Sequence, residues 1–253
     1  MAAIQEIECK SLMGKSNIPE LDYCINPYVG CLHACVYCYA RFMKRFTNHR
    51  ERWGDFLDIK VNAPEVLEKE LSGRTREGVV LLGSVTDPYQ PAEKQYRITR
   101  RVLEVLRPHS LTVSILTKSD LILRDIDLIG RLQDCEVGLS ITSADDAVGR
   151  AFEPGASPPS KRIETLKELH AKGITTYAFI GPILPGLTRL DEILGAVVGH
   201  VDFVVAEALN TRCGSWSEVC NTLQQYRPDL VVEWEKNIRV REYWSGVEAE
   251  LKE

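Results

Sequence analysis

Short apolar runs alternate with longer amphipathic stretches from about residue 58 to residue 210. This alternation is typical of repeated β–α units around a parallel sheet. The chain contains about six such units, fewer than the eight of a closed barrel. The pattern therefore predicts an α/β fold, a partial, open (β/α)6 barrel with parallel strands. The predicted strands are an early one near Tyr23–Asn26, then Val79–Gly83, Leu111–Leu116, Glu136–Ile141, Thr175–Ile180 and Asp202–Ala206.

Two of the intervening helices have clear end signals. Asn62 and Pro64 open the run EVLEKEL with a capping residue and an early proline, and Gly73 closes it. Ser160 starts KRIETLKELHAK, whose apolar positions repeat at helical spacing until Gly173. Both helices fall between predicted strands, as β–α units require.

No low-complexity linker divides the chain, so we interpret residues 1–253 as one domain. Its core is predicted at about residues 20–210, and residues of about 211–253 form a C-terminal cover packed on the barrel. The proline-rich segment Glu153–Pro159 is predicted to be a loop over the barrel mouth.

The composition is that of an ordinary globular protein, with 44% hydrophobic and 26% charged residues. No apolar run reaches the roughly 18 residues of a membrane span, and the N-terminus lacks the apolar core of a signal peptide. We therefore expect a cytoplasmic protein with no membrane partner. The net charge of −5 argues against a dedicated duplex-binding protein and leaves a nucleic-acid substrate open.

Three of the eight cysteines crowd into the segment NPYVGCLHACVYCYARFM, as Cys31, Cys35 and Cys38. Without an export signal, such crowding favours metal binding over disulfides. Thiolates are the usual ligands of iron–sulfur clusters, and three of them leave one iron of a four-iron cube open. The alternatives are a zinc site, for which His33 would be a cramped fourth ligand, and three ordinary buried cysteines.

Five stretches give the chain a resemblance to the radical S-adenosylmethionine superfamily, and within it to the spore photoproduct lyase-like branch. They are NPYVGCLHACVYCYA, SVTDPYQPAEKQYRITR, LTKSDLILRDIDLI, the pair VGLSITS and FEPGASPPSKRIETL, and FIGPILPGL. The resemblance implies a radical-SAM barrel and a [4Fe-4S] cluster on the three cysteines. It also implies that S-adenosylmethionine (SAM) binds the open iron and is cleaved to a 5′-deoxyadenosyl radical.

The resemblance also implies which residues contact SAM. The matching positions are Ser84, Lys118 and Ser140, and we add Tyr37 beside the third cysteine. Strand ends at a barrel mouth can present hydroxyls and a cation to the cofactor. Taken singly, each serine is more often a strand-end hydrogen-bonding group, and Lys118 a solvated charge. Tyr37 and Tyr39 match radical-relay tyrosines of the branch, so Tyr39 is a catalytic candidate, although both could simply pack over the cluster.

The chain departs from the branch at its hydrogen-donor cysteine, because Leu82 stands at the matching position. We therefore expect that the chain does not reverse thymine dimers by that route. Cys213 could replace the donor, since it follows the last predicted strand, and Cys220 is a weaker candidate. Asn210 and Arg212 beside it are candidate substrate contacts. Alternatively, a free cysteine is only a small, buried hydrophobic side chain.

Basic and aromatic residues alternate directly after the cluster motif, in ARFMKRFTNHRERW. Lys44 and Arg45, with Phe42 and Phe46, are what a single-stranded or flipped nucleotide would meet. The alternative is an amphipathic helix with buried aromatics. Other substrates remain open, namely a peptide, a protein side chain or a small metabolite, as does a non-catalytic iron–sulfur module. An enzyme of this kind needs a one-electron donor such as flavodoxin or ferredoxin.

Several charged residues lie in the stretches that carry the resemblance. Asp87 and Glu153 are candidates for orienting cofactor or substrate by hydrogen bonding. Arg100 and Arg124 are predicted to make buried ion pairs that shape the mouth.

Overall fold

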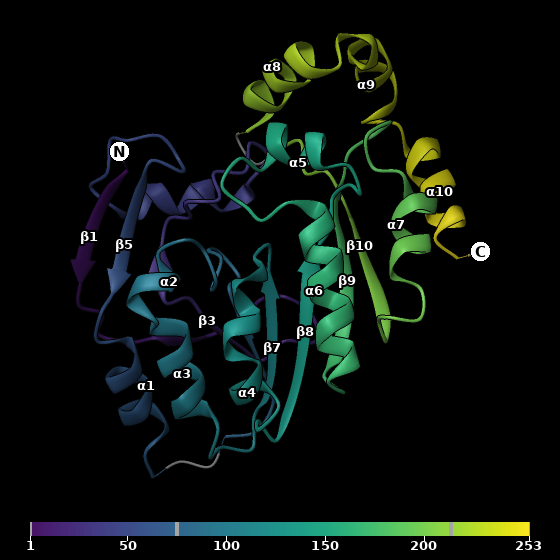
Figure 1. Ribbon diagram of the computed structural model, residues 1–253. Helices are drawn as coiled ribbons and strands as arrows, with labels where there is room; N and C mark the ends of the chain where they lie inside the picture. Colours follow the sequence, from purple (N-terminus) through teal and green to yellow (C-terminus); the bar gives the residue numbers. More distant parts are fainter. Residues whose placement is uncertain (1, 74–75, 213–214, 253) are drawn as a thin grey trace.

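The computed structural model describes residues 2–73, 76–212 and 215–252. Its main sheet has seven strands in the order β10-β9-β8-β7-β6-β3-β2 (Figure 1). The six strands from β3 to β10 run parallel, and β2 pairs antiparallel with β3. The predicted α/β fold with six parallel strands is confirmed, with ends shifted by one to three residues. The strands are β2 Met13–Lys15, β3 Tyr23–Ile25, β6 Val79–Leu82, β7 Thr112–Thr117, β8 Asp134–Ser140, β9 Thr175–Ile183 and β10 Phe203–Ala208.

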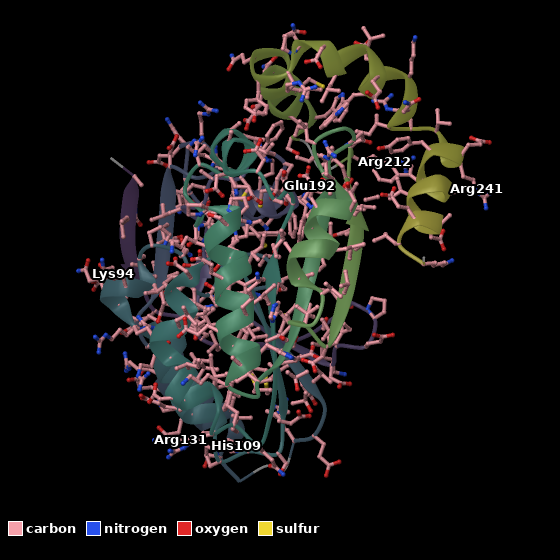
Figure 2. The ribbon with its side chains drawn as sticks, turned by 45° about the vertical axis from the view of Figure 1, so that its right-hand side comes forward. Lys94, His109, Arg131, Glu192, Arg212 and Arg241 are labelled. Atoms are coloured by element: carbon pink, nitrogen blue, oxygen red, sulfur yellow. The ribbon has the colours of Figure 1, made fainter. Side chains whose placement is uncertain are left out.

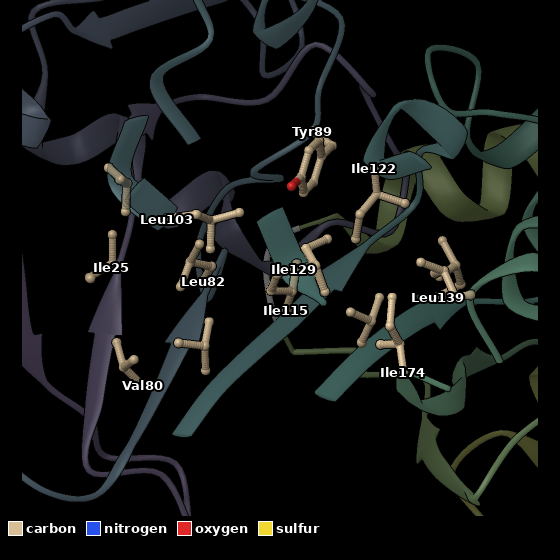
Figure 3. Close-up of a cluster of buried hydrophobic side chains, with 14 of the residues drawn as sticks. Ile25, Val80, Leu82, Tyr89, Leu103, Ile115, Ile122, Ile129, Leu139 and Ile174 are labelled. Carbon is tan, nitrogen blue, oxygen red and sulfur yellow. The ribbon is translucent and has the colours of Figure 1, made fainter. Parts of the chain in front are cut away.

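Helices follow the strands and cover one face of the sheet, where α3, α4 and α6 lie side by side in Figure 1. Side chains alternate between the two faces of a strand. Leu82, Ile115 and Leu139 therefore point into the layer between sheet and helices, and each is fully buried there (Figure 3). The helices are α1 Ala63–Leu71, α2 Glu93–Tyr96, α3 Ile98–Leu106, η2 Asp120–Asp125, α4 Ile126–Ile129, α5 Asp146–Phe152, α6 Pro159–Ala171 and α7 Leu190–Val197.

The other face of the sheet is concave and partly filled by Tyr177. A Cβ on Gly138 would lie 2.2 Å from the Tyr177 ring, so the missing side chain makes room for it. Phe203 stacks on Tyr177 with ring centroids 4.9 Å apart. Leu82 does not share this face, because its side chain points toward the helices.

The predicted helix starts were wrong in detail. Asn62 precedes α1 but caps nothing with its side chain, which instead exchanges two hydrogen bonds with the backbone of Cys9. Helix α6 begins at Pro159, one residue before Ser160, whose hydroxyl donates to Asp146 at 2.8 Å. In both places a distant polar partner outcompetes the local cap.

A second, smaller sheet was not predicted. It has the order β1-β5-β4, from β1 Ala3–Ile7, β5 Phe56–Lys60 and β4 Tyr28–Val29. Leu57 and Ile59 of β5 pack into the main core. The 3-10 helix η1, Tyr39–Phe46, connects the cysteine segment to this sheet.

The C-terminal segment forms α8 Trp216–Tyr226, η3 Pro228–Leu230, α9 Val231–Asn237 and α10 Arg241–Glu250. Trp234 is 1% exposed and donates from Nε1 to the Pro185 carbonyl at 2.7 Å. Helices α8 and α9 lie beyond the carboxyl ends of the strands, the end at which Figure 2 shows Arg212, whereas His109 and Arg131 lie at the opposite end. No helix among the described residues is both long and apolar enough to cross a membrane.

Candidate active site

The cysteine segment forms a buried loop between β4 and η1. Two backbone turns shape it, because the Ala34 amide donates to the Cys31 carbonyl at 3.3 Å and the Cys38 amide donates to the Cys35 carbonyl at 3.2 Å. Cys31 and Cys35 are 8% and 7% exposed, and Cys38 is half-buried. The spacing Cys-x3-Cys-x2-Cys thus places three thiols on one short loop at the barrel mouth.

The surroundings of the thiols suit metal ligands. Burial raises the pKa of all three thiols, and the charges of neighbouring cysteines add to this for Cys31 and Cys35. Such thiols stay protonated until a metal ion binds the sulfur, which releases the proton and stabilises the thiolate. Among the described residues, no three His, Cys, Asp or Glu side chains lie close enough to share a single metal ion. Three clustered thiols are the donor set that a four-iron cluster takes from proteins, so they fit that group.

His33 is not placed to complete a zinc site. Its Nδ1 lies 2.8 Å from the Gly155 carbonyl, and its Nε2 lies 3.2 Å from the Asp87 carboxylate, off the line of an ideal hydrogen bond. Both ring nitrogens therefore face acceptors on other segments. The hypothesis that His33 is a fourth zinc ligand is contradicted by this geometry.

Two distant segments hold the cysteine loop from opposite sides. On one side, Thr86 Oγ1 donates to the Gly30 carbonyl at 2.5 Å, and Gln90 Oε1 accepts from the Leu32 amide at 2.9 Å. On the other, the Gly155 amide donates to the His33 carbonyl at 3.0 Å. The second segment is the predicted loop Glu153–Pro159, which does lie at the mouth. The contacts of Thr86, Gln90 and Gly155 were not foreseen, because they join positions more than 50 residues apart.

Glu153 and Arg162 form a buried ion pair beside the loop. The Glu153 carboxylate accepts hydrogen bonds from Arg162 Nη2 and from the Tyr37 hydroxyl, and Thr142 Oγ1 donates to it at 3.2 Å. Burial opposes ionisation of Glu153, but the charges of Arg162 and Lys118 outweigh it and lower the pKa to about 2. Glu153 is thus a permanent negative charge that fixes Tyr37.

Lys118 supplies a positive charge next to the thiols. Its Nζ lies 5.7 Å above the centre of the Tyr37 ring, a cation–π contact. Burial opposes protonation of Lys118, but the charges of Cys35 and Glu153 raise its pKa above the ordinary value. The structure therefore brings Lys118, Tyr37 and Cys35 together, and an ammonium is suited to binding a carboxylate.

The two candidate serines lie at the carboxyl ends of β6 and β8, with β7 between these strands. Ser84 Oγ accepts from Asn26 Nδ2 at 2.9 Å, and the Ser84 carbonyl accepts from the Tyr39 hydroxyl. Ser140 is 2% exposed, and its carbonyl accepts from Arg162 Nη1 at 2.7 Å. The Ser84 hydroxyl thus also has the strand-end hydrogen bond expected of an isolated serine.

Tyr39 connects the third cysteine to the last strand of the sheet. Burial raises its pKa to about 12, and the charges of Cys38 and Glu207 add to that rise. Glu207 lies near the carboxyl end of β10; burial raises its pKa, and the charge of Lys118 partly offsets this. The sequence analysis missed Glu207, although its place at a predicted strand end was a signal that could have found it.

The basic residues after the loop are divided between two roles. Arg41 donates to the Cys38 carbonyl at 3.1 Å and pairs with Glu218 of α8, so it is structural. Arg45 is exposed on η1, and Lys44 is half-buried and donates from Nζ to the Arg50 carbonyl at 3.0 Å. Phe42 and Phe46 are 37% and 70% exposed, and the Arg45 guanidinium lies 5.5 and 5.7 Å from their ring centres. The alternative of an amphipathic helix with buried aromatics is therefore wrong for Phe42 and Phe46, whereas Trp53, the third aromatic of the run, is half-buried.

The candidates after the last strand are not brought to the thiols by any contact described. Asn210 and Arg212 are exposed, and the Arg212 amide donates to Asn210 Oδ1 at 2.9 Å. Cys213 lies outside the described residues. Cys220 has Glu235 and Arg239 as its charged neighbours, so it faces the C-terminal helices rather than the mouth.

The predicted ion pairs of Arg100 and Arg124 are confirmed. Arg124 binds Glu93 and Asp125 at 2.7 and 2.6 Å, and Arg100 binds Asp125 at 2.9 Å. These pairs join α2, α3 and η2.

Comparisons with known proteins identify the class. The Radical SAM superfamily model matches residues 25–195, and the chain therefore belongs to that superfamily, which implies a four-iron cluster and SAM. An uncharacterized protein of Methanocaldococcus jannaschii, MJ0683, is 37% identical over 227 residues, which are 89% of this chain and 84% of that protein. The Radical SAM Nalpha-GlyT isomerase of Pseudomonas phage M6 is 27% identical over 66% of this chain and 34% of its own length.

The fold is that of the lyase-like branch. Spore photoproduct lyase complexed with dinucleoside spore photoproduct superposes with a TM-score of 0.64 at 17% identity, over 89% of this chain and 66% of the lyase. At that identity the likeness establishes the fold alone. It agrees with the partial radical-SAM barrel that the resemblance implied.

Proposed function

We propose that this chain cleaves SAM reductively at a [4Fe-4S] cluster bound by Cys31, Cys35 and Cys38. The observation that carries the proposal is the set of three thiols on one loop, two of them buried and one half-buried, with the Lys118 ammonium beside them. When bound, such a cluster supplies one electron that breaks a sulfonium bond of SAM and gives a 5′-deoxyadenosyl radical. A flavodoxin or ferredoxin is the expected donor of that electron.

The surrounding residues have distinct parts in this proposal. Lys118 binds the carboxylate of SAM, because a buried ammonium makes strong charge-assisted hydrogen bonds. Tyr37 holds Lys118 by its ring and is itself held by Glu153. Ser84 and Ser140 lie at the carboxyl ends of β6 and β8, on either side of β7, where hydroxyls can bind ribose or amino groups.

Anaerobic reconstitution tests the proposal. The protein is loaded with iron and sulfide, reduced with SAM present, and assayed for 5′-deoxyadenosine. We expect Cys35→Ala to lose the cluster and all product. Lys118→Met is expected to keep the cluster but to form 5′-deoxyadenosine roughly tenfold more slowly at limiting SAM, because one charge-assisted hydrogen bond is lost.

Other results would identify another kind of protein. Bound zinc, or a cluster whose four irons are all held by protein, would refute the proposal. An intact cluster that never yields 5′-deoxyadenosine would identify a non-catalytic iron–sulfur module.

We further propose a nucleic acid or nucleotide as the substrate. The exposed rings of Phe42 and Phe46, with Arg45 over both, form a surface on which a base can stack while cations meet phosphates. A cavity of about 530 Å³, lined by Phe46, His49 and Arg50 among others, borders this surface. The lyase of similar fold was solved with a dinucleoside.

Binding of a labelled single-stranded oligonucleotide tests the substrate class. We expect affinity to fall as salt rises, and Lys44→Glu with Arg45→Glu to weaken binding at least tenfold at low salt. The matched control is Lys94→Glu with Arg131→Glu, the same charge change at sites away from η1 (Figure 2). If the wild type binds no oligonucleotide at low salt, a peptide or small metabolite becomes the substrate class to test.

Radical handling after SAM cleavage is assigned to Tyr39 and Cys213. Tyr39 lies between the third cysteine and the last strand, where a relay could pass. Cys213→Ala is expected to leave SAM cleavage intact and to block product formation. Full turnover by that variant would remove Cys213 from the proposal.

A further inference from the structure

We propose that the indole N–H of Trp53 donates a hydrogen bond to the sulfur of Cys38 and thereby raises the reduction potential of the cluster. This inference rests on the proposed function, because it requires Cys38 to be a cluster ligand. It assigns a role to a residue outside the cysteine motif. Trp53 is a positioning residue in this scheme, since it acts through the ligand sulfur.

The segment that carries Trp53 packs directly against the cysteine loop. A Cβ on Gly54 would lie 2.4 Å from the Cβ of Ala34, so the two backbones are in close contact. The Phe56 carbonyl would lie 2.6 Å from a Cβ on Gly30, at the start of the same loop. Trp53 meets Phe56 edge to face, with ring centroids 5.8 Å apart, which fixes the plane of the indole.

The indole N–H is a buried donor without a conventional partner among the described residues. It lies beside Cys38, without an ordinary hydrogen bond to the thiol in this structure. Leaving such a donor unpaired costs about 1–3 kcal/mol. A protonated thiol is a weak acceptor, whereas a thiolate on iron carries negative charge and accepts strongly. The acceptor of this N–H is therefore the Cys38 thiolate, which forms when the cysteine binds a cluster iron.

A hydrogen bond to a ligand sulfur changes the redox balance of a cluster. Reduction adds an electron and increases the negative charge on the sulfurs, so a donor at one of them stabilises the reduced state more than the oxidised state. The three ligands differ in this respect. Cys31 has Asp87 among its charged neighbours and Cys35 has Lys118, whereas Cys38 has the indole donor in addition to the cations Lys118 and Arg41.

The test compares wild type with Trp53→Phe, which keeps an aromatic ring and removes the N–H. Both are reconstituted anaerobically and titrated with a reductant while the reduced cluster is followed by electron paramagnetic resonance. We expect the midpoint potential to become more negative, so that at a fixed potential the ratio of reduced to oxidised cluster falls on the order of three- to tenfold. For a one-electron couple, tenfold corresponds to 59 mV.

Trp244→Phe is the matched control, because its Nε1 donates to the Ile238 carbonyl at 2.9 Å in the C-terminal helices. It should leave the potential unchanged. If Trp53→Phe fails to fold, β-(3-benzothienyl)alanine at position 53 replaces the N–H with sulfur at nearly constant shape. An unchanged potential in a folded, fully loaded variant overturns the inference and leaves the proposed function intact. Failure of the wild type to assemble a cluster overturns both.

Discussion

Single side chains in this site are arranged so that two buried carboxylates stay ionised. Burial alone would neutralise Asp87 and Glu153, yet the pKa of each is lowered to about 2. His33 does this for Asp87, and Arg162 with Lys118 does it for Glu153. Buried charges persist only when they are paired and hydrogen-bonded. These pairs therefore hold the cysteine loop and the Lys118 ammonium in fixed places.

Glu153 provides a test of this arrangement through pH. Its folded pKa lies below the ordinary value of 4.5, so its stabilisation is present above pH 4.5 and is lost as pH falls toward 2. Glu153→Gln should lower the free energy of unfolding by about 3–5 kcal/mol at pH 7, since Arg162 is left buried without its partner. The deficit should shrink by roughly 3 kcal/mol between pH 5 and pH 2.

Urea unfolding of wild type and variant across that pH range provides the measurement. Glu164→Gln is the control, because its pair with Lys161 is exposed and surface pairs contribute little. A deficit for Glu153→Gln that stays constant from pH 7 to pH 2 would show that the carboxylate charge is not what stabilises the fold.

Some residues of the site could be predicted from the sequence, and others could not. Cys31, Cys35 and Cys38 could be assigned because their spacing is local and its chemistry specific. Lys118 was found only through the resemblance, since a lone lysine after a strand has no chemical signature. Glu207 was missed, because its nearness to Tyr39 depends on how the sheet curves, and no local pattern records that.

Among the elements, the loop Glu153–Pro159 has the most direct effect on the cysteine loop. A Cβ on Gly155 would lie 2.1 Å from the Leu32 carbonyl, a distance that no relaxed structure permits. Gly155→Ala should therefore push the two loops apart and lower iron content per chain several-fold after reconstitution, while circular dichroism shows an intact fold. We compare it with Gly195→Ala in α7, where nothing lies within 4 Å of the added methyl group.

Gly195→Ala should keep full iron content, because alanine is favoured over glycine inside a helix. Equal iron content in the two variants would show that the contact between Gly155 and Leu32 does not control the cluster site.

Elements with strong periodicity were predicted well, and short ones were not. The strands β6 to β10 are apolar enough to be visible as runs. By contrast, β1 has a polar sequence with exposed side chains, and β4 has only two residues. Their pairing with β5 joins Ala3 to Phe56 and Tyr28 to Ile59, contacts too distant in sequence for a local pattern to encode.

At the scale of the whole molecule, the cysteine loop shares a hydrophobic core with the C-terminal helices. That core includes Cys35, Tyr37, Phe152 and Trp234, and it is separate from the larger core between sheet and helices. The predicted C-terminal cover is therefore in contact with the site it covers. A loss of packing in this second core should speed release of the cluster, whereas an equal loss in the first core should not.

Two core truncations of similar cost separate these cases. Trp234→Ala removes the centre of the second core, and Leu106→Ala removes a fully packed side chain of the first. Each should lower the free energy of unfolding by about 2–5 kcal/mol. We expect the loaded Trp234→Ala protein to release iron to a chelator several-fold faster than the wild type, measured by loss of cluster absorbance.

Leu106→Ala should release iron at close to the wild-type rate, since its cavity lies in the layer between sheet and helices. The comparison depends on where the packing is lost, because the total stability lost is similar in both variants. If both variants release iron equally fast at equal stability, cluster retention follows global unfolding. The C-terminal helices would then have no specific part in holding the cysteine loop.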